Sequence, residues 1–511
     1  MKGTIGDFQL NINHIFNRME TYFKTSIVYY SRNSEINRMT FMELAVKIRK
    51  TAQYLAKLGI KPGDIVATLS WNTIRHLQLY FAVPLIGAVL NTINIKYHKD
   101  MIKSIIKENN VKLLFYEGIA EDLLEGINVK TIAMEQNFDS NIESTQSILN
   151  FYDNPEKNAA MICYTSGTTG NPKGVAYTHK SIFIHSLSLL AYDSIALSKK
   201  DICMVMVPMY HISGWDIPFA AALTGANIAL PGVHPEIREI INMISSCRVN
   251  KAFAAPAVWT SILDYSSNNA INLEPLKYAG IGGAEPSDYI IKTLLESGIE
   301  TWHLWGMTET EAIATISKPE TGNVHNQGIP MPAFEINAIN DKNEKLKWDG
   351  KSTGELLVRG AYATSGYLHI NASNKLVELD DKKWIRTGDI IKINSDGSIK
   401  IVDRAKDLIK SGGEWISSID LENAIMEHPG VLEAAVITKH DAKWGERPLA
   451  LIVKKTKYRR TLDKNSIKEY LISIDKFPKW WIPDDFYFVD EIPKTGTGKF
   501  DKKLLRTIYS K

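Results

Sequence analysis

Residues 164–175 read YTSGTTGNPKGV, and the interpretation of the whole chain starts from this stretch. It combines four Ser/Thr side chains with three glycines and a lysine, Lys173, and the apolar residues 159–162 precede it as a buried strand would. Glycines let backbone N–H groups approach an anion closely, and hydroxyls and a lysine add donors, so the stretch predicts a polyphosphate-binding loop. It is not a Walker A loop, because Gly174 follows Lys173 where Ser or Thr is required. A flexible Ser/Thr/Gly connection is the alternative.

Strand and helix patterns alternate on both sides of this loop, which implies βαβ units and mostly parallel sheets. A capping box, Thr40 to Glu43, begins one helix. The carboxyl ends of parallel strands gather at one edge of a sheet, where ligands bind. We therefore expect the clusters at 165–173, His211, 282–285 and 308–309 to converge. Helices are expected at 40–58, 75–90, 180–190 and 236–246, and strands at 65–69, 111–118, 202–207, 228–230 and 251–254.

The pattern changes after Gly328 to short strands and turns, which predict an antiparallel lobe resembling a β-barrel over 328–402. A separate α+β pattern starts after a boundary near 403–406. The predicted fold class is therefore α/β, with a large N-terminal domain (1–403) of mostly parallel, helix-flanked sheets plus this lobe, and a small α+β C-terminal domain (407–511).

Length and composition restrict the class of protein. The chain has 511 residues, 44% of them hydrophobic and 23% charged, and a net charge of +3. These values are typical of a globular protein with several domains and give no support to nucleic-acid binding. The basic run at 454–460 is interpreted as a solvated edge. Three cysteines without CxxC spacing (Cys163, Cys203 and Cys247) predict buried thiols in a reducing compartment, and no signal-peptide core is evident, so a cytoplasmic location is expected.

Five motifs follow one another in a fixed order. They are YTSGTTGNPKGV (164–175), WGMTET (305–310), RTGD (386–389), DRAKDLIKSGGEWIS (403–417) and PKTGTGKFDKKLLR (493–506). Together they resemble the acyl-adenylate-forming (AMP-binding) superfamily of acyl-CoA synthetases, luciferases and nonribosomal adenylation domains. Three more stretches resemble its medium- and long-chain fatty acyl-CoA synthetases: WNTIRHLQLYFAVPLIGAVLNTIN (71–94), VPMYHISGWDIPFAA (207–221) and HDAKWGERPLA (440–450).

The resemblance implies a two-step reaction with ATP, Mg²⁺ and coenzyme A. A carboxylate and MgATP give acyl-AMP and diphosphate, and the CoA thiol then displaces AMP. It also implies that the C-terminal domain rotates about a hinge at 404–406 between the two steps. Lys406 is a variant at this hinge, where several family members have aspartate.

The resemblance further assigns nucleotide-binding roles. The phosphate loop would grip the β- and γ-phosphates, a second loop would hold adenine beside Trp305, and Asp389 would accept the ribose hydroxyls with Arg404 as its partner. Thr308 would bond the α-phosphate and Glu309 would be a magnesium ligand. The alternatives are ordinary turns and a helix start. The two loops comprise Thr165, Ser166, Gly167, Thr168, Thr169 and Lys173, and Gly282, Gly283, Ala284 and Glu285.

Lys499 matches the lysine that bridges the substrate carboxylate and the α-phosphate during adenylation. In the second pose a different set would replace it and help form the pantetheine tunnel; this set contains Lys410, Gly412, Gly413 and Glu414, and Trp444 is grouped with it. His211 resembles a residue over the acyl carboxylate, although a lone histidine after a strand is commonly structural. Trp215 matches a tryptophan that gates the acyl tunnel in some long-chain members, and a core aromatic is the alternative.

The sequence thus predicts an AMP-forming acyl-CoA synthetase, an acid–thiol ligase, for a medium- or long-chain fatty acid. A short-chain or hydroxy-acid CoA ligase, and a fatty acyl-AMP ligase that loads a carrier protein, are the alternatives; no carrier domain follows Lys511. The matching residues argue against a non-catalytic relative; they are Lys173, Glu309, Asp389, Arg404 and Lys499. A homodimer and peripheral contact with a membrane are both compatible with the sequence.

Overall fold

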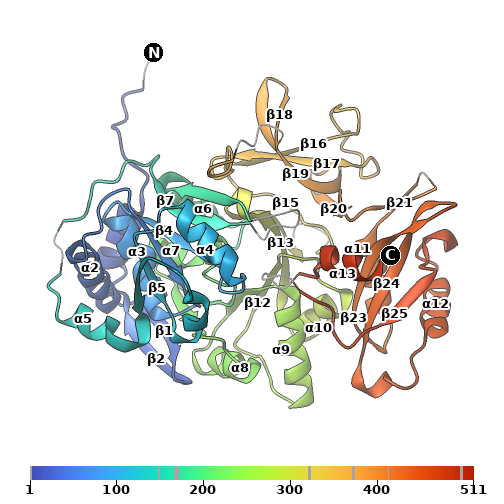
Figure 1. Cartoon of the computed structure of the whole chain (residues 1–511), viewed down its shortest axis with the longest axis horizontal. Coiled ribbons are helices and arrows are strands. Elements are labelled where there is room, and N and C mark those ends of the chain that lie inside the picture. The colour runs from blue at the N-terminus through green and yellow to red at the C-terminus, as the bar shows by residue number, and fades with distance from the viewer. Residues whose placement is uncertain are drawn as a thin grey trace.

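The computed structural model describes residues 3–147, 150–165, 172–319, 324–370, 375–412, 414–494 and 499–510. Figure 1 shows a large N-terminal part built from two sheets and their helices, a lobe of strands above it, and a C-terminal domain beside it. The predicted α/β fold class is confirmed. Of the four groups of strands in the described ranges, two belong to the N-terminal part, one to the lobe and one to the C-terminal domain.

The larger sheet has nine described strands and is parallel in its centre. Its order is β15-β14-β13-β12-β11-β9-β10-β1-β2. Antiparallel pairing is confined to β2, β14 and β15 at the two ends. The strands are β1 (Ile27–Arg32), β2 (Glu35–Thr40), β9 (Ile202–Val205), β10 (Asn227–Leu230), β11 (Lys251–Ala254), β12 (Tyr278–Gly282), β13 (Glu300–Met307), β14 (Ala312–Ser317) and β15 (Ile329–Pro330).

The second sheet runs β6-β5-β3-β4-β7-β8 and is parallel except for β8. The phosphate-loop stretch joins β7 to β8, so it follows a buried strand as the sequence predicts. The strands are β3 (Ile65–Leu69), β4 (Val89–Thr92), β5 (Leu113–Tyr116), β6 (Lys130–Ala133), β7 (Ala159–Tyr164) and β8 (Gly174–Thr178).

Helices cover both faces of these sheets. The capping box is present: the Thr40 amide donates to Glu43 Oε2 at 2.6 Å, and the Glu43 amide donates to Thr40 Oγ1 at 3.2 Å. The helices of the N-terminal part are α1 (Ile12–Tyr22), α2 (Phe41–Lys57), α3 (Ile74–Leu85), α4 (Lys99–Glu108), α5 (Asp139–Glu143), α6 (His179–Ser188), α7 (Ile217–Thr224), α8 (Ile237–Ser246), α9 (Pro256–Asn268) and α10 (Asp288–Glu296).

The helix predicted at 75–90 is too long. Helix α3 ends at Leu85, and β4 begins at Val89. Gly87 adopts a φ of +81° in the connection, a left-handed conformation that ends a helix. Val89 and Leu90 then pair with Ile65 and Val66 of β3. Tertiary strand pairing therefore overrides the helical pattern of this apolar run.

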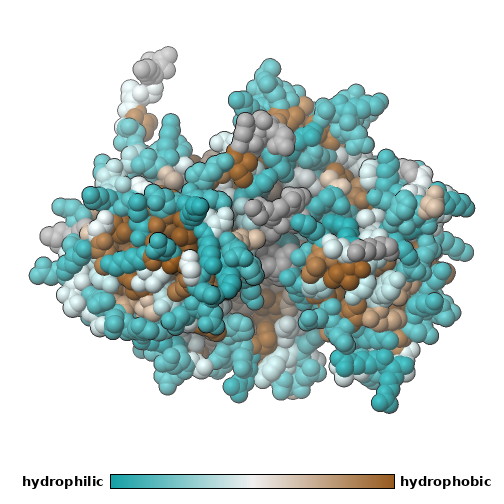
Figure 2. Space-filling view, in the orientation of Figure 1, coloured by the Kyte–Doolittle hydropathy of each residue, from teal (hydrophilic) through white to brown (hydrophobic). Residues whose placement is uncertain are grey.

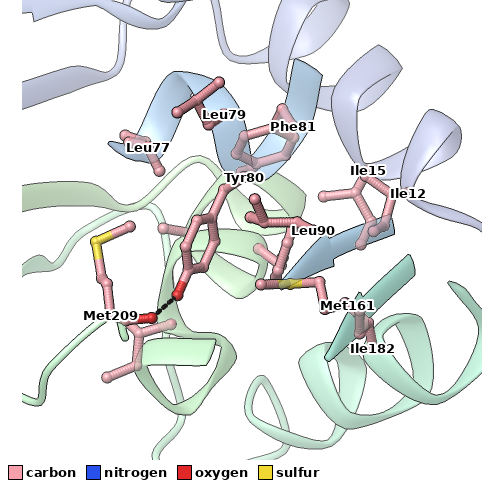
Figure 3. Close-up of a cluster of buried hydrophobic side chains, with 14 of the residues drawn as sticks. Ile12, Ile15, Leu77, Leu79, Tyr80, Phe81, Leu90, Met161, Ile182 and Met209 are labelled. Carbon is pink, nitrogen blue, oxygen red and sulfur yellow. Dashed lines mark hydrogen bonds between the residues drawn. The ribbon is translucent and has the colours of Figure 1, made fainter. Parts of the chain in front are cut away.

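Three apolar cores separate the layers. The largest lies between the two sheets and includes most of the apolar side chains of α3, a helix in which every residue is buried. Figure 3 shows how α1, α3, β4, β7 and α6 contribute Ile15, Phe81, Leu90, Met161 and Ile182 to it. A second core joins the outer face of the nine-stranded sheet to α8, α9 and α10, and a third joins the outer face of the six-stranded sheet to α4.

The lobe is a curled antiparallel sheet whose strands lie between Phe334 and Arg404. Its longest strand, β19, pairs with β17, β18 and β20. This arrangement places Asp389 of β19 directly opposite Arg404 of β20. The strands are β16 (Phe334–Ile339), β17 (Gly354–Gly360), β18 (Leu376–Leu379), β19 (Lys382–Ile393) and β20 (Ile399–Arg404).

The C-terminal domain follows β20 and has its own sheet and core. Its helix α11 is tied to the end of β20, because Asp403 Oδ2 accepts hydrogen bonds from the Ser418 amide and hydroxyl, both at 2.6 Å. The elements are β21 (Ile409–Ser411), β22 (Glu414–Ile416), α11 (Ser418–Met426), β23 (Val431–Asp441), β24 (Gly445–Lys454), α12 (Lys464–Ser473), β25 (Asp485–Phe488) and α13 (Lys502–Tyr509).

The surface is largely hydrophilic on the face drawn in Figure 2, with smaller hydrophobic patches on both domains. The three cysteines are buried free thiols, as expected. Within the ranges given above, none of the helices combines the length and the apolar character needed to cross a membrane.

Candidate active site

The predicted ribose carboxylate lies where the lobe meets the nine-stranded sheet. Asp389 is buried, and its Oδ1 pairs with Arg404 Nε at 2.5 Å. Its Oδ2 accepts a hydrogen bond from Trp305 Nε1 at 3.0 Å. Trp305 belongs to β13, whose neighbour β12 ends at Gly282, the first residue of the predicted adenine loop. The structure thus brings Trp305 to Asp389, a contact that sequence reasoning did not predict.

The predicted magnesium ligand sits on a short 3₁₀ turn, Thr308–Thr310, at the end of β13. The Tyr367 hydroxyl donates to the Glu309 carboxylate, and the Thr364 amide donates to the Glu309 carbonyl at 2.8 Å. Thr308 is held in the same way, because Tyr177 donates to its carbonyl at 2.8 Å. Both predicted residues are therefore buried and fixed by side chains from other elements.

Two hydrogen bonds join the ends of the predicted phosphate loop. The Thr165 amide donates to the Lys173 carbonyl at 2.9 Å, and the Lys173 amide donates to Thr165 Oγ1 at 3.0 Å. The Lys173 ammonium lies 5.0 Å from the centre of the Tyr367 ring, so it lies beside the tyrosine that contacts Glu309. The remaining predicted loop residues, Ser166, Gly167, Thr168 and Thr169, lie outside the described residues.

Lys499 brings the C-terminal domain to this site. Burial lowers the pKa of its ammonium to about 8; Arg404 and Lys406 lower it further, whereas Asp389 and Glu309 act in the opposite direction. Burial, and then the Lys499 charge, lower the pKa of His211 to about 3. The charged groups that act on the Lys499 pKa are thus the predicted ribose carboxylate Asp389, Glu309, Arg404 and Lys406, and the Lys499 charge acts in turn on His211.

The predicted adenine loop is exposed at Gly283 and Ala284, and Gly283 has a φ of +90°. Trp215 lies behind it, since a Cβ atom built on Gly282 would come within 2.9 Å of the Trp215 ring. Glu285 extends this loop to the C-terminal domain, where Asn423 Nδ2 donates to its Oε1 at 3.4 Å. Burial, followed by the nearby Asp420 charge, raises the pKa of Glu285 to about 8.

The set expected to act in the second pose is grouped on the C-terminal domain. Strands β21 and β22 form a hairpin that pairs Ser411 with Glu414. Gly412 has a φ of +60°, and its amide donates to the Trp444 carbonyl at 2.8 Å. The Lys410 ammonium lies 5.3 Å from the centre of the Trp415 ring, and Trp444 is 47% exposed. Gly413 lies outside the described residues.

Sequence reasoning missed the two tyrosines of the Glu309 turn. Tyr177 lies on β8 and Tyr367 follows β17, so neither is near residues 308–309 in the chain. A single tyrosine in a strand or turn carries no local pattern that reveals such a contact. In the described part of the chain, no three His, Cys, Asp or Glu side chains gather in a way that would hold a metal ion by themselves.

The family model of AMP-binding enzymes matches residues 18–368, and the model of their C-terminal domain matches residues 420–499. The chain belongs to the AMP-binding enzyme family. The two matches span the parts of the chain that carry the phosphate loop, the Glu309 turn and Lys499.

Relatives of this AMP-binding enzyme are similar over almost their whole length. A medium-chain-fatty-acid–CoA ligase of Ectopseudomonas oleovorans is 34% identical, covering 94% of this chain and 93% of the relative. A long-chain-fatty-acid–CoA ligase of Thermus thermophilus is also 34% identical, covering 99% and 97%. The crystal structure of an anthranilate CoA ligase with anthranoyl-AMP has the same fold, with a TM-score of 0.89, 21% identity and 99% coverage of both chains. The expected enzyme class, an AMP-forming acid–thiol ligase, is thereby confirmed.

Proposed function

We propose that this enzyme is an acyl-CoA synthetase that converts a medium- or long-chain fatty acid, ATP and coenzyme A into acyl-CoA, AMP and diphosphate through an acyl-AMP intermediate. The observation that carries the proposal is the position of Lys499. Its ammonium lies in electrostatic reach of Asp389 and Arg404 on the nucleotide side and of His211 on the expected acid side.

The first step joins two anions. A carboxylate oxygen attacks the α-phosphorus of ATP, and diphosphate leaves. A cation between the reactants reduces their repulsion and stabilises the charge that develops on the phosphoryl oxygens. Lys499 supplies that cation from the C-terminal domain. Thr308 presents its hydroxyl from a turn whose carbonyl is fixed by Tyr177, so the donor is oriented before the substrate binds.

Glu309 suits magnesium. Its carboxylate is a hard oxygen ligand, and Tyr367 donates a hydrogen bond to one of its oxygens and thereby orients it. Mg²⁺ is commonly held by one or two carboxylates together with substrate phosphates and water, so a single protein ligand is sufficient. When bound, the ion neutralises charge on the departing diphosphate.

The acid side is apolar. Trp215 is buried against Gly282, and the seven residues that follow Asp216, from Ile217 to Leu223, are all buried apolar residues. Phe253 of β11 and Leu304 of β13, the two strands that flank β12, lie against Gly280 of the same strand as Gly282. An alkyl chain is the substrate class that such surroundings favour, because burial of each CH₂ group contributes about 0.8 kcal/mol.

The second step requires a different face of the C-terminal domain. We infer that rotation about residues 404–406 removes Lys499 and presents the β21–β22 hairpin with Lys410, Gly412 and Trp444 to the acyl-AMP. A slender pantetheine arm suits an approach past glycine, and an exposed tryptophan suits a base. A homodimer and membrane contact remain predictions from the sequence.

The test is diphosphate release with acids from acetate to palmitate, each with and without CoA. Release that rises with chain length, and acyl-CoA as the product, is the expected result. Activity confined to acetate or to hydroxy acids would assign a short-chain ligase. Acyl-AMP that accumulates with CoA and is consumed only by a phosphopantetheinyl carrier protein would assign a carrier-loading enzyme.

A further inference from the structure

Met209, two residues before His211, is held by side chains from another part of the fold. Its amide donates to Asn72 Oδ1 at 2.8 Å, and its carbonyl accepts a hydrogen bond from the Tyr80 hydroxyl. Figure 3 shows the Tyr80 side chain reaching from α3 to the Met209 carbonyl. Tyr80 and Met209 are fully buried, and Asn72 is 5% exposed. Both polar groups of this one residue are therefore fixed without any strand or helix pairing.

The Asn72 side chain bonds the backbone just beyond the end of β9. The strand stops at Val205, and Asn72 Nδ2 donates to the carbonyls of Val205 at 2.6 Å and Val207 at 2.9 Å. The amide orientation is fixed by its surroundings, because two carbonyls face the nitrogen and one N–H faces the oxygen. The Asn72 backbone carbonyl also accepts from the Gly232 amide at 3.1 Å. One side chain thus satisfies three buried backbone groups of residues 205–209.

The supporting residues are themselves rigid. His76 lies between Asn72 and Tyr80 in the sequence; one ring nitrogen is 2.7 Å from the Trp71 carbonyl and the other is 3.0 Å from Thr68 Oγ1. Its ring meets the Tyr80 ring edge-on with centroids 5.0 Å apart, and Phe219 stacks on Tyr80 at 5.7 Å. This network explains why polar and aromatic residues occur at 72, 76 and 80 in an otherwise apolar stretch.

The segment downstream of Met209 needs such support. His211 donates its amide to the Pro208 carbonyl at 3.0 Å, and Gly214 donates to the His211 carbonyl at 3.2 Å. Ile212 and Trp215 have φ values of +44° and +58°, a left-handed conformation that persists only when surrounding contacts hold it. Met209 lies just before this strained turn, and side chains hold both its backbone amide and its backbone carbonyl.

We propose that Asn72 and Tyr80 are positioning residues for the acid side of the site: by fixing Met209 they set the positions of His211 and Trp215 relative to the substrate carboxylate and chain. The inference rests on the proposed function, in which His211 and Trp215 face the acid. Neither Asn72 nor Tyr80 touches the substrate in this scheme, so both act through residues 207–215.

The test compares Tyr80→Phe with Tyr362→Phe, using full-length enzyme and a fatty acid that the wild type activates. Tyr362 is a matched control, because its buried hydroxyl also donates to a backbone carbonyl, that of Pro332 at 3.0 Å. We expect Tyr80→Phe to lower kcat/KM for the acid about tenfold, because the Met209 carbonyl loses its donor. KM for ATP and Tm should match those of Tyr362→Phe.

A double-mutant cycle with His211→Ala tells positioning from a general structural role. If Tyr80 acts through His211, Tyr80→Phe should change kcat/KM for the acid by less than about twofold in the His211→Ala background. Asn72→Asp is the second variant; it keeps the side-chain volume but loses the donor to Val205 and Val207, and should give the same selective loss.

The inference would be overturned if Tyr80→Phe impaired the kinetics for ATP as much as those for the acid. It would also be overturned if Tyr80→Phe lowered kcat/KM for the acid equally in the wild-type and His211→Ala backgrounds. Acid kinetics that remain equal to those of the wild type would overturn it as well. A wild-type enzyme that activates no fatty acid would instead refute the proposed function, which separates the two failures.

Discussion

Arg404 and Asp389 face each other across the strand pair β19–β20 and form an ion pair with an Nε–Oδ1 distance of 2.5 Å. The other carboxylate oxygen of Asp389 is bound by the Trp305 indole at 3.0 Å. Asp389 is buried, whereas the Arg404 side chain is 34% exposed. The carboxylate is therefore held in one orientation before a nucleotide arrives, and the arginine that holds it is the first residue of the expected hinge at 404–406.

Trp305→Phe should weaken nucleotide binding without affecting the acid. The change removes one hydrogen bond to a buried carboxylate, a contact worth about 1.5–3 kcal/mol, so KM for ATP should rise about tenfold or more. Trp384→Phe is the control, because the Trp384 indole donates to the Leu379 carbonyl at 3.1 Å, and Trp384 lies on β19, the strand that carries Asp389. Equal ATP kinetics for both variants would show that the indole does not orient Asp389.

Lys499→Ala should stop the first half-reaction and spare the second. Acid-dependent exchange between ATP and diphosphate should be lost, because no other predicted cation bridges the two anions. Thiolysis of supplied acyl-AMP by CoA should continue. Lys503→Ala, on the exposed face of α13, is the control. Equal loss of both half-reactions would refute the role assigned to Lys499.

Tyr367→Phe should raise the magnesium concentration needed for half-maximal adenylation, because Glu309 loses the donor that orients it. Glu309→Ala should raise it further or abolish adenylation. Tyr289→Phe is a matched control, since its exposed hydroxyl donates to the Asp264 carboxylate at 3.3 Å. Magnesium titrations of adenylation measure the effect, and unchanged titrations for Glu309→Ala would argue against metal ligation.

The contact between the two domains should weaken as pH rises. Burial and the Asp420 charge raise the pKa of Glu285 from its ordinary value of 4.5 to about 8, while Lys400 and His325 act in the opposite direction. The folded state therefore binds more protons than the unfolded state between these two values. The stability that Glu285 contributes is accordingly greatest below about pH 4.5 and is lost progressively up to about pH 8.

Trypsin cleavage of the segment 404–410 reports this change. Wild-type cleavage relative to Glu285→Gln should rise between pH 6 and pH 8.5, because the neutral glutamine keeps the contact with Asn423 at both values. Glu296→Gln is the control, because Glu296 is an exposed residue at the end of α10, the helix that follows Glu285. Its cleavage should match that of the wild type at both pH values. A constant ratio between wild type and Glu285→Gln would exclude Glu285 as the titrating group.

Gly412→Ala should impair thioester formation and leave adenylation unchanged. The new Cβ atom would lie 2.9 Å from the Trp444 ring, on a backbone with a φ of +60°. Gly397→Ala is the control: Gly397 also has a positive φ, and its Cβ would meet Trp348 at 3.4 Å. Acyl-AMP should accumulate in the first variant only. Normal acyl-CoA formation by Gly412→Ala would remove the β21–β22 hairpin from the CoA site.

The local signals of the sequence were sufficient for most elements. The capping box at Thr40, the parallel alternation and the change of pattern after Gly328 all correspond to the observed elements. The sequence was misleading at residues 86–90, where an apolar run reads equally well as helix or strand. Pairing of Val89 with Ile65 decided that segment, and such pairing is invisible in a local window.

The sequence by itself determined the family and the chemistry, because the motifs carry the residue types that phosphate, ribose and magnesium require. Only the tertiary structure decided how those residues are held. The deciding contacts join residues that are 58 to 137 positions apart in the chain. They are those of Trp305 with Asp389, of Tyr367 with Glu309, and of Asn72 and Tyr80 with Met209. Hydrogen bonds of this kind depend on the packing of sheets and helices against each other, and residue order alone does not specify them.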